Sequence, residues 1–277
     1  MDTLSPAERR VARALLSDYP SAGLSTATEL ARLASTSAPS VVRFTTRLGL
    51  GGFSDLQERL RNELKVRQDS PASRAEVELE GEGPSEMTNR GSVHRADLLV
   101  ESIRSVPTSQ IEEAVRSLAD LSRAVLLSGG YFSTLIARYF SLQLSQVRPK
   151  VFYLAEPMHR DVNYLLGARR RDLFVTFDLR RYESETLIAT QEAGRRGCTT
   201  LVITDQWLSP ACAQADIVLP TETRASSFDS MVPALALVES LISPVINAIG
   251  PAAVEQMSEW EAINSPHRRH LADDEPS

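Results

Sequence analysis

The stretch that decides the N-terminal fold is residues 37–56, which read SAPSVVRFTTRLGLGGFSDL. Val41, Phe44 and Leu48 follow one another at i, i+3 and i+7, which is the spacing of one face of a helix. We therefore expect a helix over Ala38–Leu48 whose apolar face is buried.

Capping signals set the limits of this helix and of its neighbours. Ser37 is expected to cap it, and Gly49 to end it in a left-handed conformation. Upstream, Ser5 and Thr26 are each followed three residues later by a Glu, which is the capping-box pattern of a helix start. Ser54 opens a further helix. The N-terminal region is therefore predicted to hold four short helices.

Two short helices joined by a tight turn indicate a helix-turn-helix, in which the second helix places its first residues at base edges in the major groove. Opposite the apolar face, Arg43 is long enough to fork onto a guanine, Ser40 can bond a base edge or a phosphate, and Arg47 is placed for a phosphate. On periodicity alone, a helical packing unit with solvated arginines fits equally well. The predicted DNA-binding residues are Ser37, Ala38, Pro39, Ser40, Arg43 and Arg47.

The charge of the chain is unevenly spread. The whole chain of 277 residues carries a formal net charge of −6, which argues weakly against nucleic acid as a partner. Residues 1–67, however, hold ten Lys and Arg against seven Asp and Glu, so they carry +3 and residues 68–277 carry −9. We expect a basic module joined to an acidic one, with DNA contact confined to the first.

Composition also divides the chain into domains. Residues 68–92 are rich in Glu, Ser, Gly and Pro and poor in large apolar side chains, which predicts a flexible acidic linker. Residues 264–277 predict a polar tail on the same grounds. The expected domains are therefore a DNA-binding domain over 1–67 and a second, effector-binding and dimerisation domain over 93–252.

The sequence predicts a cytoplasmic protein. Its two cysteines, Cys198 and Cys212, cannot form a disulfide framework, so a reducing compartment is expected. We recognise no run of about 18 apolar residues, which is the length that a membrane-spanning helix needs, so no membrane span is expected. The charged, amphipathic N-terminus lacks the apolar core of a signal peptide.

Short apolar runs alternate with helical patterns in the second domain, which predicts an α/β fold with a parallel sheet flanked by helices. Strands are expected over 124–128, 150–154, 173–177, 200–204 and 217–219. The long apolar helix over Met231–Ile249 fits either a core helix or a dimer seam, and the core position is favoured.

Polar clusters follow the predicted strands, at 128–133, 177–184, 204–206 and 226–230. Ligands of such sheets bind beyond the carboxyl ends of the strands. Each cluster alone is more typical of a solvated turn, but four clusters on one edge favour a pocket.

The first cluster suits an anion, because a Gly129-Gly130 turn leads into a helix whose free backbone N–H groups point outward near Ser133. The predicted effector-binding residues are Ser128, Gly129, Tyr131, Ser133, His159, Asp178, Arg180, Arg181, Ser184, Asp205, Ser226, Ser227 and Asp229.

Two resemblances cover most of the chain. Residues 4–67 resemble the N-terminal domain of the RpiR family of bacterial transcriptional regulators, through the opening LSPAERRVARALL, the ELA at 29–31 and the S-x-x-[ST]-V-V-R-F…L-G-[FL]-x-G-F run from Ser37. Residues 107–250 resemble the SIS (sugar isomerase) domain. The SIS resemblance is carried by Gly129, Ser133, Ala137, Asp172, Glu185, Thr186, Thr204, Ser209, Ala215 and Asp216.

The resemblances imply a DNA reader whose recognition helix is Ala38–Leu48, joined to a domain that binds phosphorylated sugars and usually dimerises. A homodimer or higher homo-oligomer would then bind a palindromic operator in double-stranded DNA. Ligand binding would shift the balance between arrangements that can and cannot bind that operator.

The second phosphate loop departs from the pattern that the SIS resemblance implies. In place of S-x-S-G-x-T, this chain has Asp178, Arg180, Arg181 and Glu183, and Tyr131 replaces a glycine of the first loop. Asp178 would repel a phosphate placed as in the family. The two arginines could hold a carboxylate or phosphate from another angle, or could form a structural ion-pair cluster with the aspartate.

An isomerase-type enzyme is the main alternative, because His159 and Glu156 follow the second predicted strand and could act as a base. No nucleophile–base–acid signature and no metal-ligand cluster is recognisable, so no catalytic residue, metal or cofactor is predicted. We expect a non-enzymatic transcriptional regulator that senses a small anionic metabolite, sugar-phosphate-like or carboxylate, with no membrane partner. A DNA-binding scaffold with a ligand-free SIS fold is the third possibility.

Overall fold

The computed structural model describes residues 4–68, 70–78 and 83–272. It divides into two compact units, Met1–Leu79 and Glu80–Ser277. Each unit has its own hydrophobic core, which agrees with the expectation of two domains.

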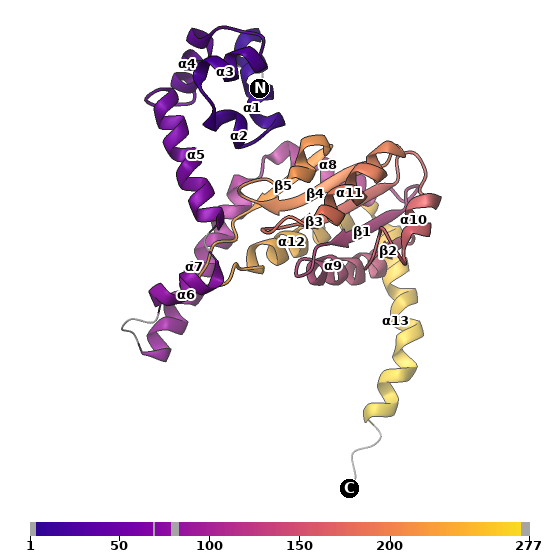
Figure 1. The fold of residues 1–277 in the computed structure, drawn as a ribbon. Coiled ribbons are helices and arrows are strands. Elements are labelled where there is room, and N and C mark those ends of the chain that lie inside the picture. Colours follow the sequence, from indigo (N-terminus) through magenta and orange to yellow (C-terminus); the bar gives the residue numbers. More distant parts are fainter. Residues whose placement is uncertain (1–3, 69, 79–82, 273–277) are drawn as a thin grey trace. The chain divides into compact units, whose positions relative to one another are not determined.

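The N-terminal unit is all-helical (Figure 1). Ser5 and Glu8 form the expected capping box at the start of its first helix, and Thr26 accepts a hydrogen bond from the Glu29 N–H at the third. A single-turn helix that was not predicted follows Pro20. The helices are α1 (Pro6–Ser17), α2 (Ser21–Leu24), α3 (Ala27–Leu33), α4 (Ala38–Arg47), α5 (Phe53–Gln68) and α6 (Pro71–Glu78).

The core of this unit holds the predicted apolar stripe of α4, with one exception. Val41 and Phe44 are buried, as expected, but Leu48 is 50% exposed. α4 ends at Arg47, and the chain turns away at Gly49, whose φ is +77°. Leu50 packs against the core instead of Leu48, because this turn redirects the chain.

The predicted linker over 68–92 is helical for most of its described length. The described residues there form α6 and the first part of α7 (Pro84–Ser105). α7 is anchored farther along by the buried side chains of Leu98 and Ser102. Because a helix that is already nucleated extends at little cost, polar residues upstream of the anchor can join it.

The C-terminal unit is built on a five-stranded parallel sheet of order β2-β1-β3-β4-β5 (Figure 1). All five strands lie where short apolar runs predicted them. The strands are β1 (Val125–Gly129), β2 (Val151–Tyr153), β3 (Leu173–Asp178), β4 (Thr199–Asp205) and β5 (Ile217–Thr221). The helices after α7 are α8 (Thr108–Ala119), α9 (Thr134–Val147), α10 (Val162–Gly167), α11 (Ser184–Arg195), α12 (Val232–Ile249) and α13 (Pro251–Ala272), with a 3₁₀ turn over Pro210–Gln214.

Helices cover both faces of this sheet. One core contains Val125, Phe177 and Phe140 with the buried side of α12. The other contains Phe174 with Ala189 of α11. The continuous apolar runs of the strands follow from burial on both faces.

α12 and α13 complete the unit. α12 is long and apolar enough to cross a membrane by length and composition, but it packs against α7, α8 and α9 and buries Leu237 and Leu241 in the core. The predicted polar tail over 264–277 is helical as far as Ala272, because α13 continues to that residue. α13 is anchored on α9 through its buried Ala253, and the helix extends from this contact.

Candidate functional site

α4 presents a continuous exposed stripe. Pro39, Val42, Arg43 and Thr46 are all exposed and recur at i, i+3, i+4 and i+7, which places them on one face. The opposite face packs into the core. Val42 and Thr46 were not among the predicted residues, although the helical period that predicts the buried face also predicts this complementary one.

The expectation that Ser40 lies on the outer face is wrong. Ser40 is buried, because it precedes Phe44 by one turn and shares its face. Its hydroxyl accepts a hydrogen bond from Arg43 Nη2 at 2.9 Å and lies 3.1 Å from the Ser37 hydroxyl. Ser37 occupies the N-cap position without a side-chain cap bond, and Ala38 packs against the core. Ser40 therefore holds Arg43 in place.

Arg47 is tied to α1. Its Nη1 lies 3.3 Å from Glu8 Oε2, and about half of the Arg47 side chain is exposed. The pKa of Glu8 is lowered, chiefly because the Ser5 backbone N–H donates a hydrogen bond to this carboxylate. Glu8 thus stays ionised and steers Arg47, whose outer part remains accessible.

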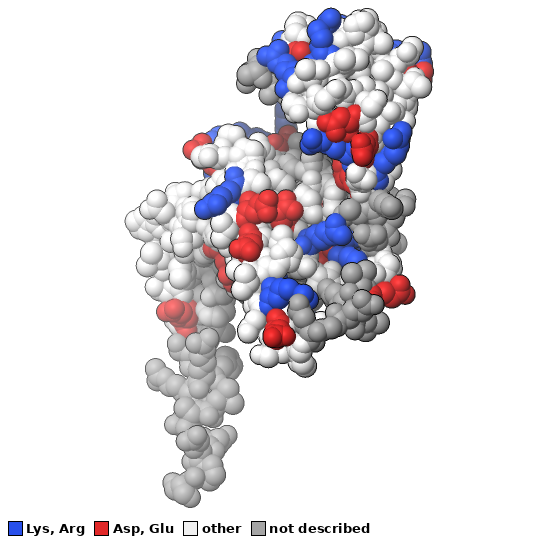
Figure 2. Space-filling model, turned by 90° about the vertical axis from the view of Figure 1, so that its left-hand side faces the viewer, with Lys and Arg blue, Asp and Glu red and all other residues white. Residues whose placement is uncertain are grey.

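Positive charge on the N-terminal unit is scattered. On the face seen in Figure 2, the Lys and Arg side chains of this unit lie at several separate places and do not form one continuous patch. On this face, the positive charge of the unit is therefore not gathered at one place.

The carboxyl ends of the strands in the second unit meet in one row. β1 ends at Gly129, β3 at Asp178, β4 at Asp205 and β5 at Thr221, and the parallel ladders bring these ends side by side. The predicted polar clusters at 128–133, 177–184 and 204–206 therefore lie along one edge of the sheet, and the ion pair between Arg180 and Asp229 brings the cluster at 226–230 to the same edge.

The first loop at this edge is closed by internal hydrogen bonds. The buried Ser133 hydroxyl accepts from the Gly130 N–H at 2.9 Å and donates to the Phe177 carbonyl at 2.6 Å. The Tyr131 N–H donates to Glu183 Oε1 at 2.6 Å. Ser133 therefore shapes the loop, and a carboxylate of the chain itself occupies the position predicted for an anion.

Close approach requires a glycine at 129 and leaves little room for a side chain at Gly130. A Cβ on Gly129 would lie 2.8 Å from the backbone nitrogen of Thr134, and one on Gly130 would lie 3.1 Å from Glu183 Oε1. The backbone thus stays close to the start of α9, where its N–H groups favour negative charge.

Arg180 is a structural cross-link. Only 10% of its side chain is exposed, its Nη1 lies 3.2 Å from Asp229 Oδ1, and its guanidinium carbon lies 5.5 Å from the centre of the Trp207 ring. The ion-pair interpretation therefore describes Arg180. Arg181, by contrast, is exposed at the surface, and its φ is +85°.

Two buried carboxylates lie behind this loop. Asp178 is 2% exposed and accepts a hydrogen bond from the Ser209 hydroxyl, and burial raises its pKa to about 6. Asp205 accepts from the Tyr182 hydroxyl at 2.6 Å and from the Trp207 N–H at 3.1 Å. An ion-pair cluster of Asp178 with the arginines was one of the two alternatives, but the structure places the Ser209 hydroxyl on this carboxylate.

Several predicted effector residues do not converge. His159 is 73% exposed, and its Nε2 lies 3.8 Å from Glu185 Oε1. Ser128 is buried within β1, whereas Ser184 is exposed and the serines at 226–227 are partly exposed. Within the part of the chain that the structure describes, no group of three or more His, Cys, Asp and Glu side chains is placed to hold a metal.

Three residues that organise this edge were not among the predicted effector-binding residues. Glu183 precedes α11, Trp207 follows Asp205 by two positions, and Ser209 caps the 3₁₀ turn. Ser209 was noted only as part of the SIS resemblance and Glu183 only as part of the altered second loop. The density of polar residues after β3 and β4 does not say which side chains face one another.

The chain thus combines a helix-turn-helix unit with a parallel α/β unit that carries polar loops at one edge of its sheet. A model of the rpiR-family helix-turn-helix domain matches residues 1–67, and a model of the SIS domain matches residues 117–244. The chain belongs to the RpiR family of transcriptional regulators.

Known proteins resemble the chain over both units. An HTH-type transcriptional regulator from the aarA 3′ region of Providencia stuartii is 24% identical over 220 residues, which is 77% of this chain and 74% of that protein. Two solved structures share the fold. The sugar isomerase domain of an RpiR transcription factor from Sphaerobacter thermophilus has a TM-score of 0.59 at 24% identity over 64% of this chain and 99% of that one. The Vibrio vulnificus NanR protein complexed with ManNAc-6P has a TM-score of 0.56 at 19% identity over 96% of this chain and 95% of that one.

Proposed function

We propose that this chain is a sequence-specific transcriptional regulator that reads DNA through α4 and binds a small anionic metabolite at the carboxyl edge of its SIS sheet. We infer that it acts in the cytoplasm as a homodimer or higher homo-oligomer on a palindromic operator. The metabolite changes operator affinity through its different affinity for the DNA-competent and DNA-incompetent arrangements.

The exposed stripe of α4 carries the DNA part of the proposal. Arg43 stands at its centre, next to Val42 and one turn before Thr46. The Ser40 hydroxyl positions the Arg43 guanidinium, so less side-chain freedom is lost when Arg43 forks onto a guanine. Val42 adds an apolar group that suits the methyl of a thymine. Arg47, held by Glu8, is suited to a backbone phosphate.

The hydrogen bond from Tyr131 N–H to Glu183 Oε1 carries the effector part. It supports the view that the start of α9 accepts an anionic oxygen, because one is bound there at 2.6 Å. An effector carboxylate or phosphate would replace the Glu183 carboxylate at this position. The exposed Arg181 lies two residues away in the same loop and would add a guanidinium.

A catalytic role is not favoured by the arrangement of the edge. His159 Nε2 lies 3.8 Å from Glu185 Oε1, and the His159 side chain is largely exposed. A general base needs a substrate-facing position within hydrogen-bond reach of the proton it takes. We therefore infer that the edge binds its ligand without turnover. Conversion of a sugar phosphate that is lost in His159→Ala would favour the isomerase alternative.

The DNA part is tested by genome-wide selection of bound fragments, followed by binding assays with Arg43→Ala on the recovered operator. The variant should lose about 1–3 kcal/mol of operator binding and discriminate less between operator and mismatched sequences. Arg104→Ala, an exposed arginine of α7 in the other unit, is the matched control. Normal operator binding by Arg43→Ala would refute the assignment of α4.

The effector part is tested with Glu183→Gln in thermal-shift titrations of sugar phosphates and small carboxylates. Removal of the competing internal carboxylate should tighten binding of the anionic effector by about tenfold, since a hydrogen bond to a charged group is worth about 1.5–3 kcal/mol. Glu113→Gln, an exposed acid of α8, should leave the titration unchanged. Weaker binding in Glu183→Gln would show that the carboxylate contacts the ligand favourably, and no shift with any compound in either protein would favour the ligand-free scaffold.

A further inference from the structure

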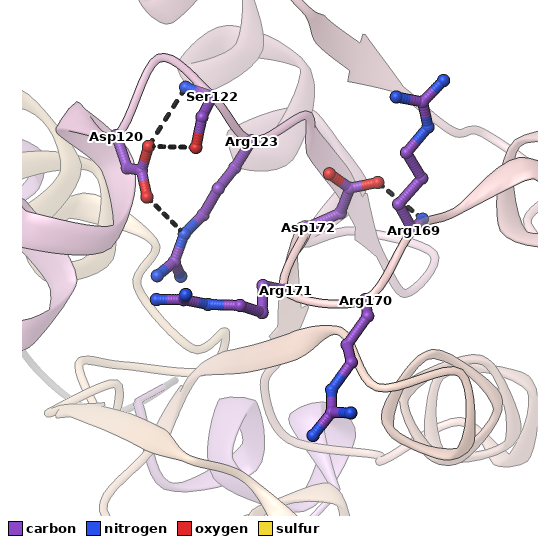
Figure 3. Close-up of a pocket in the computed structure, with 7 residues that line it drawn as sticks. All are labelled: Asp120, Ser122, Arg123, Arg169, Arg170, Arg171 and Asp172. Atoms are coloured by element: carbon purple, nitrogen blue, oxygen red, sulfur yellow. Dashed lines mark hydrogen bonds and ion pairs between the residues drawn. The ribbon is translucent and has the colours of Figure 1, made fainter.

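A second polar hollow lies at the other end of the sheet, away from the carboxyl edge. It has a volume of about 160 Å³ and is formed by the loop before β1 and the loop before β3 (Figure 3). Its lining is mostly basic. The lining residues are Asp120, Ser122, Arg123, Arg169, Arg170, Arg171 and Asp172.

Both aspartates of this hollow are engaged by neighbours. Asp172 joins the two loops, because its Oδ1 accepts from the Ala124 N–H at 2.9 Å and its Oδ2 from the Arg169 N–H at 2.7 Å. Asp120 accepts from the Ser122 N–H and hydroxyl through one oxygen, and from Arg123 Nε at 2.7 Å through the other. The backbone and Arg123 thus use the hydrogen-bonding capacity of these carboxylates, and within the described residues neither carboxylate forms an ion pair with Arg169, Arg170 or Arg171.

In the loop before β3, the backbone of the arginines at 169–171 is held in place, whereas their side chains are not. Arg171 has a left-handed φ of +75°, and its N–H donates to the Gly197 carbonyl at 2.8 Å. Figure 3 shows its side chain extending toward the guanidinium of Arg123, while Arg169 and Arg170 extend in other directions. Across residues 4–68, 70–78 and 83–272, no hydrogen bond or ion pair of the Arg169, Arg170 or Arg171 guanidinium group is found.

A buried cation adds to the positive charge behind the first loop. Arg148 is fully buried and donates to the carbonyls of Leu118 and Arg123, and at 3.2 Å to that of Pro149. Burial lowers its pKa to about 10, so it remains charged at neutral pH. Arg148 thus holds the backbone of Arg123 in place and brings a fifth guanidinium to a region with two carboxylates.

We propose that this hollow is a second anion site, which binds a small phosphate-bearing molecule between Arg123 and Arg171. Two converging guanidinium groups repel each other, and an anion placed between them is favoured by both. Four lining arginines against two aspartates leave a formal charge of +2, which matches the roughly two negative charges of a phosphate monoester better than the single charge of a carboxylate. Forked guanidinium groups bind the oxygens of such a group in pairs. The site would sense a ligand independently of the carboxyl edge.

The experiment is calorimetric titration of the full-length protein with inorganic phosphate at pH 8 and low ionic strength, with acetate as the monoanionic comparison. Arg171→Gln should weaken phosphate binding about tenfold, because it removes one of two charge-assisted contacts. Arg171→Lys should keep part of the binding, since it retains the charge without the fork. Arg104→Gln is the matched control. It removes one positive charge from α7, outside the hollow, and should leave phosphate binding unchanged.

The proposal is overturned if phosphate does not bind saturably, if acetate binds as tightly as phosphate, or if Arg171→Gln binds phosphate like the wild type. Phosphate held only at the carboxyl edge would give the last of these results. Thermal unfolding checks that Arg171→Gln is folded, as expected for a side chain without internal partners. Should Arg171→Gln not fold, Arg171→Lys provides the test, with an expected loss of about threefold because the charge stays but the fork is removed.

Discussion

Asp178→Asn should remove a pH-dependent loss of stability that the wild-type SIS unit carries. Asp178 ends β3 and is almost fully buried, and the burial raises its pKa from 3.8 to about 6. The Ser209 hydroxyl, which donates to the carboxylate, can donate equally to the amide oxygen of Asn. The substitution therefore keeps the shape and this contact while it removes the ionisation.

The magnitude follows from the two pKa values. Between pH 3.8 and 6 the folded state binds more protons at this position than the unfolded state, so stability falls as pH rises through this window. At about 1.36 kcal/mol per pKa unit, the ionised carboxylate costs about 3 kcal/mol above pH 6, of which about 2 kcal/mol develops between pH 4.5 and 7.5. The Asn variant carries no such dependence.

The assay is urea unfolding of both proteins at half-unit steps from pH 4.5 to 7.5. The free energy of unfolding of Asp178→Asn minus that of the wild type should increase by about 2 kcal/mol across this range. The difference cancels every group that titrates alike in both proteins. A flat difference would refute the raised pKa, and a difference that decreases with pH would show that the carboxylate is stabilised in its charged form.

Two further predictions concern the arginines. Arg47→Ala should weaken binding to operator and to unrelated DNA alike and flatten the salt dependence by about one unit, whereas an effect on sequence preference alone would contradict a phosphate contact. Arg180→Ala should destabilise the SIS unit by about 2 kcal/mol in denaturant titrations without any ligand, because it leaves Asp229 without its ion pair and uncovers Trp207. If the stability of Arg180→Ala is unchanged and effector binding is lost, Arg180 contacts the ligand and is not a structural cross-link.

Elements with local causes were predictable. The Ser5 capping box starts α1, the Val41 and Phe44 stripe defines the buried face of α4, and the apolar runs before residues 129 and 178 form β1 and β3. Each depends on groups a few residues apart, whose periodicity and hydrogen bonds are set by the chain itself.

Composition alone did not predict the local structure where a distant contact anchors the segment. Residues 84–92 and 264–272 are polar enough to suggest unfolded segments, yet they extend helices that are anchored by Leu98 and Ala253 in the core. Leu48 continues the α4 stripe but is half exposed, because Leu50 reaches the core after the Gly49 turn.

The sequence by itself determined the family, the helix-turn-helix, the parallel sheet and the edge of that sheet where polar loops gather. Only the tertiary structure decided which charges meet there, since Glu183 reaches the Tyr131 amide 52 positions away and Arg180 reaches Asp229 across 49. It also brought the arginines at 169–171 beside Arg123. The reason is physical: secondary structure follows from neighbours along the chain, whereas the partner of a charge depends on which loops the register of the strands places side by side.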